Sequence, residues 1–320
     1  MFTFAQKLSL KHLAALNHYF WKYRYRFFIG IFFVISSNYF AVLAPQVTGY
    51  VVSKVQQQLP GAKPAAKVVQ HDWLVDWFVG RMDNTKHDFA WIVAICCITI
   101  LGLAVIRGLL MFFMRQTIIV MSRHIEYDQK NEIYQHYQQL DTQFYKTNST
   151  GDLMNRMAED VSRVRMYTGP AIMYFINLVA LISFCVVNMF RKDAELTLYV
   201  LAPLPLLAIT IYYVNSIINK KSEQIQGLLS DLTTNAQESY SGIRVIKSFV
   251  QEKAMLGFFT RNSEEYKQNA IALARVEAVY FPSMTLMIGI STLVTILIGG
   301  LQALEDSSRV GTIVEFVIYI

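Results

Sequence analysis

The stretch 144–165, "FYKTNSTGDLMNRMAEDVSRVR", decides the fold, because it is polar and charged while the sequence on both sides is apolar. Before it lies "FAWIVAICCITILGLAVI" (89–106), and after it lies "AIMYFINLVALISFCVVNMF" (171–190). An apolar run of about 20 residues is long enough to cross a ~30 Å hydrocarbon core as a helix. A polar block between two such runs predicts a connection that lies in water on one side of a membrane.

The composition supports a membrane protein. Of 320 residues, 54% are hydrophobic and 16% are charged, whereas soluble domains have about a quarter charged. Five full spans are predicted, at 27–47, 89–113, 171–190, 196–214 and 281–301. The start of a sixth is predicted near Val310 and is cut off at Ile320. We therefore predict an all-α membrane protein with six helices, the sixth truncated. A large soluble helical protein is the alternative, and the number and length of the runs disfavour it.

The distribution of basic residues predicts the orientation. The segments before the first span, between spans two and three and between spans four and five hold 20 of the 29 Lys and Arg residues. The segments on the other side hold eight, and Arg107 lies inside the second span. The positive-inside rule places the N-terminus and both long polar blocks in the cytoplasm. We expect a multi-pass protein of a bacterial inner membrane.

Two segments outside the spans are predicted to rest on membrane surfaces. Residues 1–26 are basic, aromatic and amphipathic, which predicts a cytoplasmic surface (elbow) helix. The outer loop 51–88 contains "HDWLVDWFVG", whose apolar residues recur at i, i+4 as in a short amphipathic helix.

The polar blocks extend the spanning helices into two cytoplasmic hairpins. The sequence from near Phe89 to near Leu140 predicts one helix of about 78 Å at ~1.5 Å per residue. A returning helix is predicted to begin after "STGD", where Ser149 and Asp152 fit a capping box, and to be kinked near Pro170. Pairs at i, i+4 join Asp152 to Arg156 and Glu159 to Arg163. The second block is predicted to continue the fourth span as a helix, to break around Gly242 and then to return, and the two hairpins are predicted to pack on each other.

The two blocks resemble the intracellular loops of ATP-binding-cassette (ABC) exporters. The first block has an aromatic pair, a turn, Gly-Asp-Leu, an Arg and Asp-Val, in the order of that family; these residues are Phe144, Tyr145, Gly151, Asp152, Leu153, Arg156, Asp160 and Val161. The segment "ESYSGIRVIKSFVQEKAMLGFF" is similar to the second loop, and "VGTIVEFVIYI" to the start of the sixth span. The resemblance covers nearly the whole chain.

The resemblance implies the transmembrane domain of a type IV half-transporter of the multidrug or lipid exporter kind. It implies ATP-driven export or flipping of an amphipathic or lipid-like substrate, and a dimer with a second half-transporter in the lipid bilayer. The hairpin turns, which the resemblance places at about 141–152 and 231–242, would couple to nucleotide-binding domains that hold ATP and Mg. The residues implied in that coupling are Phe144, Tyr145, Gly151, Asp152, Gly242 and Arg244.

The chain itself has no G-x-x-x-x-G-K-[ST] loop to cradle ATP, so we predict no enzymatic activity for it alone. The resemblance implies an ATPase domain after residue 320, fused to this one, and no cofactor, metal or nucleic-acid site within this chain. Polar residues within the spans are candidates for a cavity or translocation path: Arg107, Asn177, Asn188 and Glu315. A channel, a secondary transporter or a signalling protein on the same scaffold is the alternative, and so few intramembrane charges give it little support.

Overall fold

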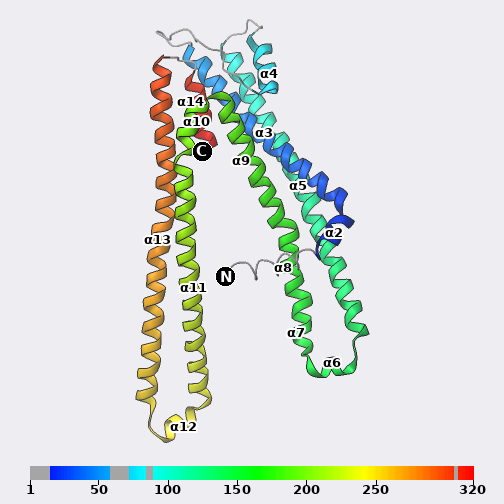
Figure 1. Ribbon diagram of the computed structural model, residues 1–320, viewed down its shortest axis with the longest axis vertical. Coiled ribbons are helices and arrows are strands. Elements are labelled where there is room, and N and C mark those ends of the chain that lie inside the picture. The colour runs from blue at the N-terminus through cyan, green and yellow to red at the C-terminus, as the bar shows by residue number, and fades with distance from the viewer. Residues whose placement is uncertain (1–14, 58–71, 84–88, 306–308) are drawn as a thin grey trace. The chain divides into compact units, whose positions relative to one another are not determined.

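The computed structural model describes residues 15–57, 72–83, 89–305 and 309–320, and its elements are all helices (Figure 1). Parts of the predicted elbow helix and outer loop, residues 1–14, 58–71 and 84–88, lie outside this description. The chain forms two compact units, residues 1–194 with 302–319 and residues 195–301 with 320. Each unit is described by itself below.

The first unit contains the long helix predicted from the sequence. Helix α5 (Phe89–Gln139) has 51 residues, which corresponds to about 76 Å. It has no proline, so every backbone amide after its first turn can donate within the helix. The apolar segment 89–113 uses only part of this length, and the remainder projects beyond it towards α6 (Thr142–Thr147), which lies at the end of the hairpin (Figure 1).

The second arm of this hairpin, which returns from α6, is helical and contains two π-helical turns. It runs through α7 (Thr150–Asn155), η1 (Arg156–Asp160), α8 (Val161–Met166), η2 (Tyr167–Ala171) and α9 (Ile172–Lys192). The second π-helical turn contains Pro170, where the sequence predicted a disturbance. Proline has no amide proton, and the wider turn accommodates the hydrogen bond that is missing there. Close packing fixes this segment, because a Cβ at Gly169 would lie 2.5 Å from Ser122 Oγ on α5.

Helix α3 (Arg24–Gln57) is the centre of the first unit. It packs against α5, α9 and α14 (Arg309–Tyr319), and it extends beyond the predicted span at both ends. The short helices α2 (Asn17–Lys22) and α4 (Trp73–Asp83) lie near its two ends. Two buried clusters form the core. One is Val34, Met114, Ile118 and Met173; the other is Leu43, Val47, Tyr50, Val75 and Cys96.

The second unit is a hairpin of two long helices. Helices α11 (Pro203–Ser241) and α13 (Glu252–Glu305) run alongside each other, and short α12 (Ile243–Ser248) connects their ends (Figure 1). Side chains of both long helices line a cavity of 280 Å³. Helix α10 (Ala194–Leu201) precedes α11, and Ser291 of α13 donates a hydrogen bond to the Val200 carbonyl at 2.7 Å.

The sequence predicted a break around Gly242, and α11 does end there. The resemblance placed the second coupling turn at about 231–242, and this placement is wrong. Those residues are helical through Ser241, and the connection between the long helices is 242–251. No proline occurs between Pro205 and Pro282, so the helical hydrogen bonds continue until Gly242. The predicted fourth span also divides into α10 and α11, because Pro203 cannot donate the amide that a continuous helix needs.

Five of the described helical segments are long and apolar enough to cross a membrane. They are 24–56, 90–139, 150–192, 194–241 and 252–304. Four of them contain a full span predicted from the sequence, and the segment 90–139 contains all of the predicted span 89–113 except residue 89. The predicted sixth span corresponds to α14, of 11 residues.

Candidate functional site

The end of the first hairpin is held by its own side chains. Asp141 caps α6, since its Oδ1 accepts a hydrogen bond from the Phe144 amide at 2.9 Å. The Tyr145 hydroxyl donates to the Tyr137 carbonyl at the end of α5. The Phe144 and Tyr145 rings meet edge to face, with their centroids 5.6 Å apart. Phe144 is half-buried, so the aromatic pair fixes this turn more than it offers an apolar surface.

The predicted capping box at Ser149 and Asp152 is wrong. Ser149 occupies the N-cap position of α7, but its side chain makes no capping hydrogen bond. Asp152 instead accepts a hydrogen bond from Arg156 Nε at 2.9 Å, the i, i+4 pair that the sequence predicted. The second predicted pair, Glu159 with Arg163, is also present. Both pairs are exposed, so solvent screens them and they contribute little to stability.

The end of the second hairpin differs from the first in what it exposes. Tyr240, Phe249 and Val250 are 77%, 71% and 79% exposed, and Val245 is 60% exposed. We call these four residues the α12 apolar cluster. Arg244 is exposed beside them, and Gly242 ends α11 with its amide donating to the Glu238 carbonyl at 2.8 Å. Exposed apolar groups gathered at the end of a long hairpin are typical of a docking surface.

The backbone of the second turn is strained at Val250. Its φ of 53° lies in the left-handed region, which a β-branched residue rarely adopts. The amides of Val250 and Gln251 donate to the carbonyls of Lys247 and Ile246, and these bonds close the turn after α12. Sequence reasoning missed this residue, because valine at a left-handed position carries no signature.

Three of the four predicted path residues contact polar groups of other helices. The Asn38 amide of α3 donates to Asn177 Oδ1 of α9 at 2.9 Å. Further along the same interface, Gln46 Nε2 donates to Asn188 Oδ1 at 3.0 Å. The fourth residue, Arg107, is exposed on α5 and contacts none of the other three.

Glu315 pairs with Lys192, and the pair is almost completely buried. Their side chains are 1% and 3% exposed, and the pair joins α14 to the last turn of α9. The neighbouring pair, Arg309 with Asp193 at 2.9 Å, connects the same two helices. A buried ion pair is costly to desolvate, so each partner depends on the other for its charge to be tolerated.

Two glycines give Glu315 its position. A Cβ at Gly49 of α3 would lie 2.4 Å from Glu315 Oε1, and a Cβ at Gly311 would lie 2.3 Å from the Gly49 carbonyl oxygen. Helices α3 and α14 can approach this closely only because both positions lack a side chain. Sequence reasoning missed the partners Asn38, Gln46 and Lys192. A polar residue within an apolar run is the signal that could have found the first two.

A second polar region lies where α2 and α8 meet the extension of α5 beyond its apolar segment. Glu126 is buried and lies 3.1 Å from Arg165 Nε, with Lys130 and Arg123 also against it. Burial alone would raise its pKa. The hydrogen bonds from Lys130 and Arg123 outweigh burial and hold the pKa of Glu126 below its ordinary value. This cluster therefore fixes the returning helix against α5 as a charged structural contact.

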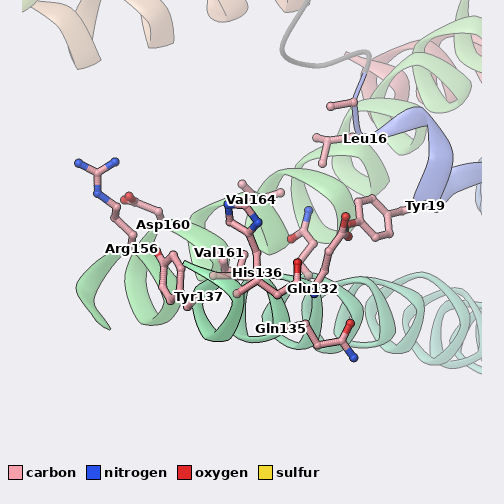
Figure 2. A pocket seen from close by; sticks show the side chains of 14 residues that line it. Leu16, Tyr19, Glu132, Gln135, His136, Tyr137, Arg156, Asp160, Val161 and Val164 are labelled. Atoms are coloured by element: carbon pink, nitrogen blue, oxygen red, sulfur yellow. Dashed lines mark hydrogen bonds between the residues drawn. The ribbon is translucent and has the colours of Figure 1, made fainter. Parts of the chain in front are cut away.

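Beside this cluster is a cavity of 760 Å³. Figure 2 shows Glu132 and His136 of α5, Tyr19 of α2, and Asp160 and Arg156 of the returning helix around it. The Tyr19 hydroxyl donates a hydrogen bond to Glu132. Burial, and after it this hydrogen bond, raise the pKa of Tyr19 to about 12. Among the described residues, no group of three or more His, Cys, Asp or Glu side chains could hold a metal ion.

The fold and these contacts define a class of protein: a multi-pass α-helical membrane domain whose spanning helices continue into long polar hairpins. The chain belongs to the ABC transporter transmembrane region family, which matches residues 27–320. It has no region that matches an ATP-binding domain, and the family match is to the membrane domain only. The fold predicted from the resemblance is therefore confirmed.

Several bacterial proteins are similar to this chain. The uncharacterized ABC transporter ATP-binding protein YknU of Bacillus subtilis is 27% identical over 217 residues, which are 68% of this chain and 37% of YknU. The multidrug resistance-like ATP-binding protein MdlA of Escherichia coli is 26% identical over 250 residues, 77% of this chain and 41% of MdlA. The ATP-dependent lipid A-core flippase of Syntrophus aciditrophicus is 26% identical over 238 residues, which are 73% of this chain and 38% of the flippase. The chain thus spans about two fifths of the relatives that it matches.

Proposed function

We propose that this chain is the translocation domain of an ATP-driven exporter or flippase. The observation that carries the proposal is the α12 apolar cluster at the end of the α11–α13 hairpin, because several exposed apolar side chains at one end of a hairpin are typical of a docking surface. Membership of the ABC transporter family supports a nucleotide-binding domain as that partner. ATP and Mg bind there, and this chain supplies the surface that transmits the movement.

The proposed coupling surface comprises both hairpin ends. At the first, the hydrogen bonds of Asp141 and Tyr145 fix α6, and Gly151 and Asp152 lie next to it in the first turn of α7. At the second, Gly242 and Arg244 lie beside the α12 apolar cluster. A turn that is fixed by its own contacts transmits displacement to the helices that it connects, whereas a loose loop would absorb it.

The substrate that we propose is amphipathic or lipid-like. Relatives are named as a multidrug resistance-like protein and as a lipid A-core flippase, and both names fit such molecules. Asn177, Asn188 and Glu315 occupy helix interfaces, so a rearrangement of α3 against α9 and α14 would expose them to a path. Arg107 is exposed on α5, where a second half-transporter would complete the path. The basic residues favour a bacterial inner membrane with cytoplasmic hairpins.

The test uses the chain in proteoliposomes, with and without the nucleotide-binding domain of its transporter. The chain alone is expected to release no phosphate from ATP above background. With the nucleotide-binding domain, ATP and Mg are expected to drive movement of a fluorescent phospholipid or a fluorescent lipophilic cation across the membrane. Phosphate release by the chain alone, or movement of both probes that is the same without ATP, would contradict the proposal.

A further inference from the structure

Helix α2 is anchored to α5 along one side. Lys22 Nζ lies 2.6 Å from Asp128 Oδ2, and the Tyr23 hydroxyl donates to the same oxygen at 2.9 Å. Burial alone would raise the pKa of Asp128, but the bonds from Lys22 and Tyr23 outweigh burial and hold that pKa below its ordinary value. Tyr19, one turn earlier, is directed at Glu132 (Figure 2). These contacts fix which side chains of the α2–α3 corner point outwards.

The outward side carries a cation held between two aromatic rings. The Arg24 guanidinium carbon lies 4.9 Å from the Trp21 ring centroid and 5.2 Å from that of Tyr25. Both rings are more than two thirds exposed. Within the described part of the chain, Arg24 pairs with no carboxylate, in contrast to Lys22. The rings hold the guanidinium in place, and most of its N–H donors stay available.

The surface next to this cation becomes apolar along α3. Phe28 and Phe32 follow Arg24 at steps of four residues, so they share its face of the helix, and they are 62% and 63% exposed. Arg26 is also exposed, two residues further along α3, and adds a second positive charge to this end of the helix. The order is therefore cation and amphipathic rings first, then hydrocarbon, which is the order of a lipid leaflet from headgroup to acyl chain.

We propose that Trp21, Arg24 and Tyr25 form a binding site for the headgroup of an anionic phospholipid. The guanidinium would donate paired hydrogen bonds to the phosphate oxygens, and the two rings would lie at the depth of the glycerol backbone. The acyl chains would follow Phe28 and Phe32. A second copy of this chain fits the surface less well, because a symmetric contact would bring two Arg24 guanidinium groups together.

The experiment measures lipid binding to the detergent-purified full chain by native mass spectrometry. The chain is titrated with dioctanoyl phosphatidylglycerol, with dioctanoyl phosphatidylcholine and with inorganic phosphate, which separates the anionic lipid from a neutral lipid and from free phosphate. The variant Arg24→Gln removes the charge, and Arg24→Lys keeps it. The control Arg261→Gln removes an exposed charge from the second unit. Circular dichroism and gel filtration check the fold and the oligomeric state.

Wild type is expected to bind the first phosphatidylglycerol more tightly than phosphatidylcholine or phosphate. Arg24→Gln is expected to weaken this binding about fivefold, the effect of one basic residue at an anionic surface. Arg24→Lys should bind between wild type and Arg24→Gln, because it keeps the charge and loses the paired hydrogen bonds, and Arg261→Gln should equal wild type. The proposal is overturned if Arg24→Gln behaves like Arg261→Gln, if both lipids bind equally, or if Arg24→Gln changes the oligomeric state and leaves lipid binding as it was.

Discussion

The carboxylate of Glu315 is tolerated inside an apolar helix bundle because Lys192 lies against it. The sequence alone indicated that this residue needs a cavity, a polar partner or the outer mouth, and the structure assigns the polar partner. The partner is 123 residues away in the chain, so no local pattern could identify it. The contact ties α14 to α9, and through Gly49 it also sets the distance to α3.

We predict that Glu315→Gln destabilises the protein. The substitution removes the carboxylate that lies against the buried Lys192 ammonium, and removal of one partner of a buried pair costs about 3–5 kcal/mol. The expected result is a markedly lower thermal unfolding temperature in detergent. The matched control is Lys192→Met with Glu315→Met, which removes both charges at similar volume and should recover most of the loss. If Glu315→Gln is as stable as wild type, the Lys192–Glu315 pair is not buried in solution.

We predict that replacing Val250 by glycine increases the stability of the protein. Glycine adopts the left-handed conformation without the steric cost that valine bears, roughly 1–2 kcal/mol. The greater conformational entropy of glycine in the unfolded chain offsets part of this gain. Val250 is 79% exposed, so little packing is lost. Val250→Gly should therefore raise the unfolding temperature slightly. Val245→Gly is the control, because it lies within α12 and should lower that temperature by weakening the helix.

At the scale of elements, the close approach of α3 and α14 depends on glycine. A Cβ at Gly311 would lie 2.2 Å from Ser53 Oγ and 2.3 Å from a backbone oxygen, so the helices must separate to accept it. We predict that Gly311→Ala costs about 1–3 kcal/mol through this overpacking. Thermal unfolding measures the loss. Gly108→Ala is the control, since nothing lies within 4 Å of its added methyl group, and it should leave stability unchanged or slightly higher.

Elements whose signal is local could be predicted from the sequence. The length of α5 follows from a run without proline, and the i, i+4 pair of Asp152 and Arg156 follows from helical spacing. The site was less predictable. Asn177, Asn188 and Glu315 were recognised as polar residues in apolar spans, but their partners depend on which helices pack together.

Two predictions failed, one at a helix cap and one at a turn. Ser149 has the residue type and position of a capping residue, yet Asp152 pairs with Arg156, so the reciprocal half of the box is lost. The second turn was placed too early. The residues before Gly242 are polar, and polarity alone does not end a helix that still has all its backbone donors.

For the whole protein, the two hairpin ends differ in a way that bears on the proposed coupling. At the first end the aromatic side chains are engaged within the turn, since Tyr145 bonds to the Tyr137 carbonyl and Phe144 is half-buried. At the second end Phe249 is 71% exposed and has no such role. Apolar contact with a nucleotide-binding domain should therefore depend more on Phe249 than on the aromatic pair of the first turn.

We predict that Phe249→Ser uncouples ATP hydrolysis from transport. An exposed side chain contributes little to the fold, so the variant should remain folded and lose only the contact with its partner. The paired measurement is substrate-stimulated phosphate release and vesicle transport on one preparation, with the nucleotide-binding domain present. Leu256→Ser is the control, because Leu256 is 66% exposed on α13 outside the α12 apolar cluster.

The first hairpin end gives the comparison that distinguishes a coupling contact from general damage to the hairpins. Tyr145→Phe removes only the hydroxyl that bonds to the Tyr137 carbonyl, which should cost about 1 kcal/mol and loosen the turn. Its effect on transport should therefore be smaller than that of Phe249→Ser and should accompany a loss of thermal stability. If Phe249→Ser transports and hydrolyses like Leu256→Ser, the α12 apolar cluster does not couple the membrane domain to ATP, and the exposed apolar side chains of this hairpin serve another contact.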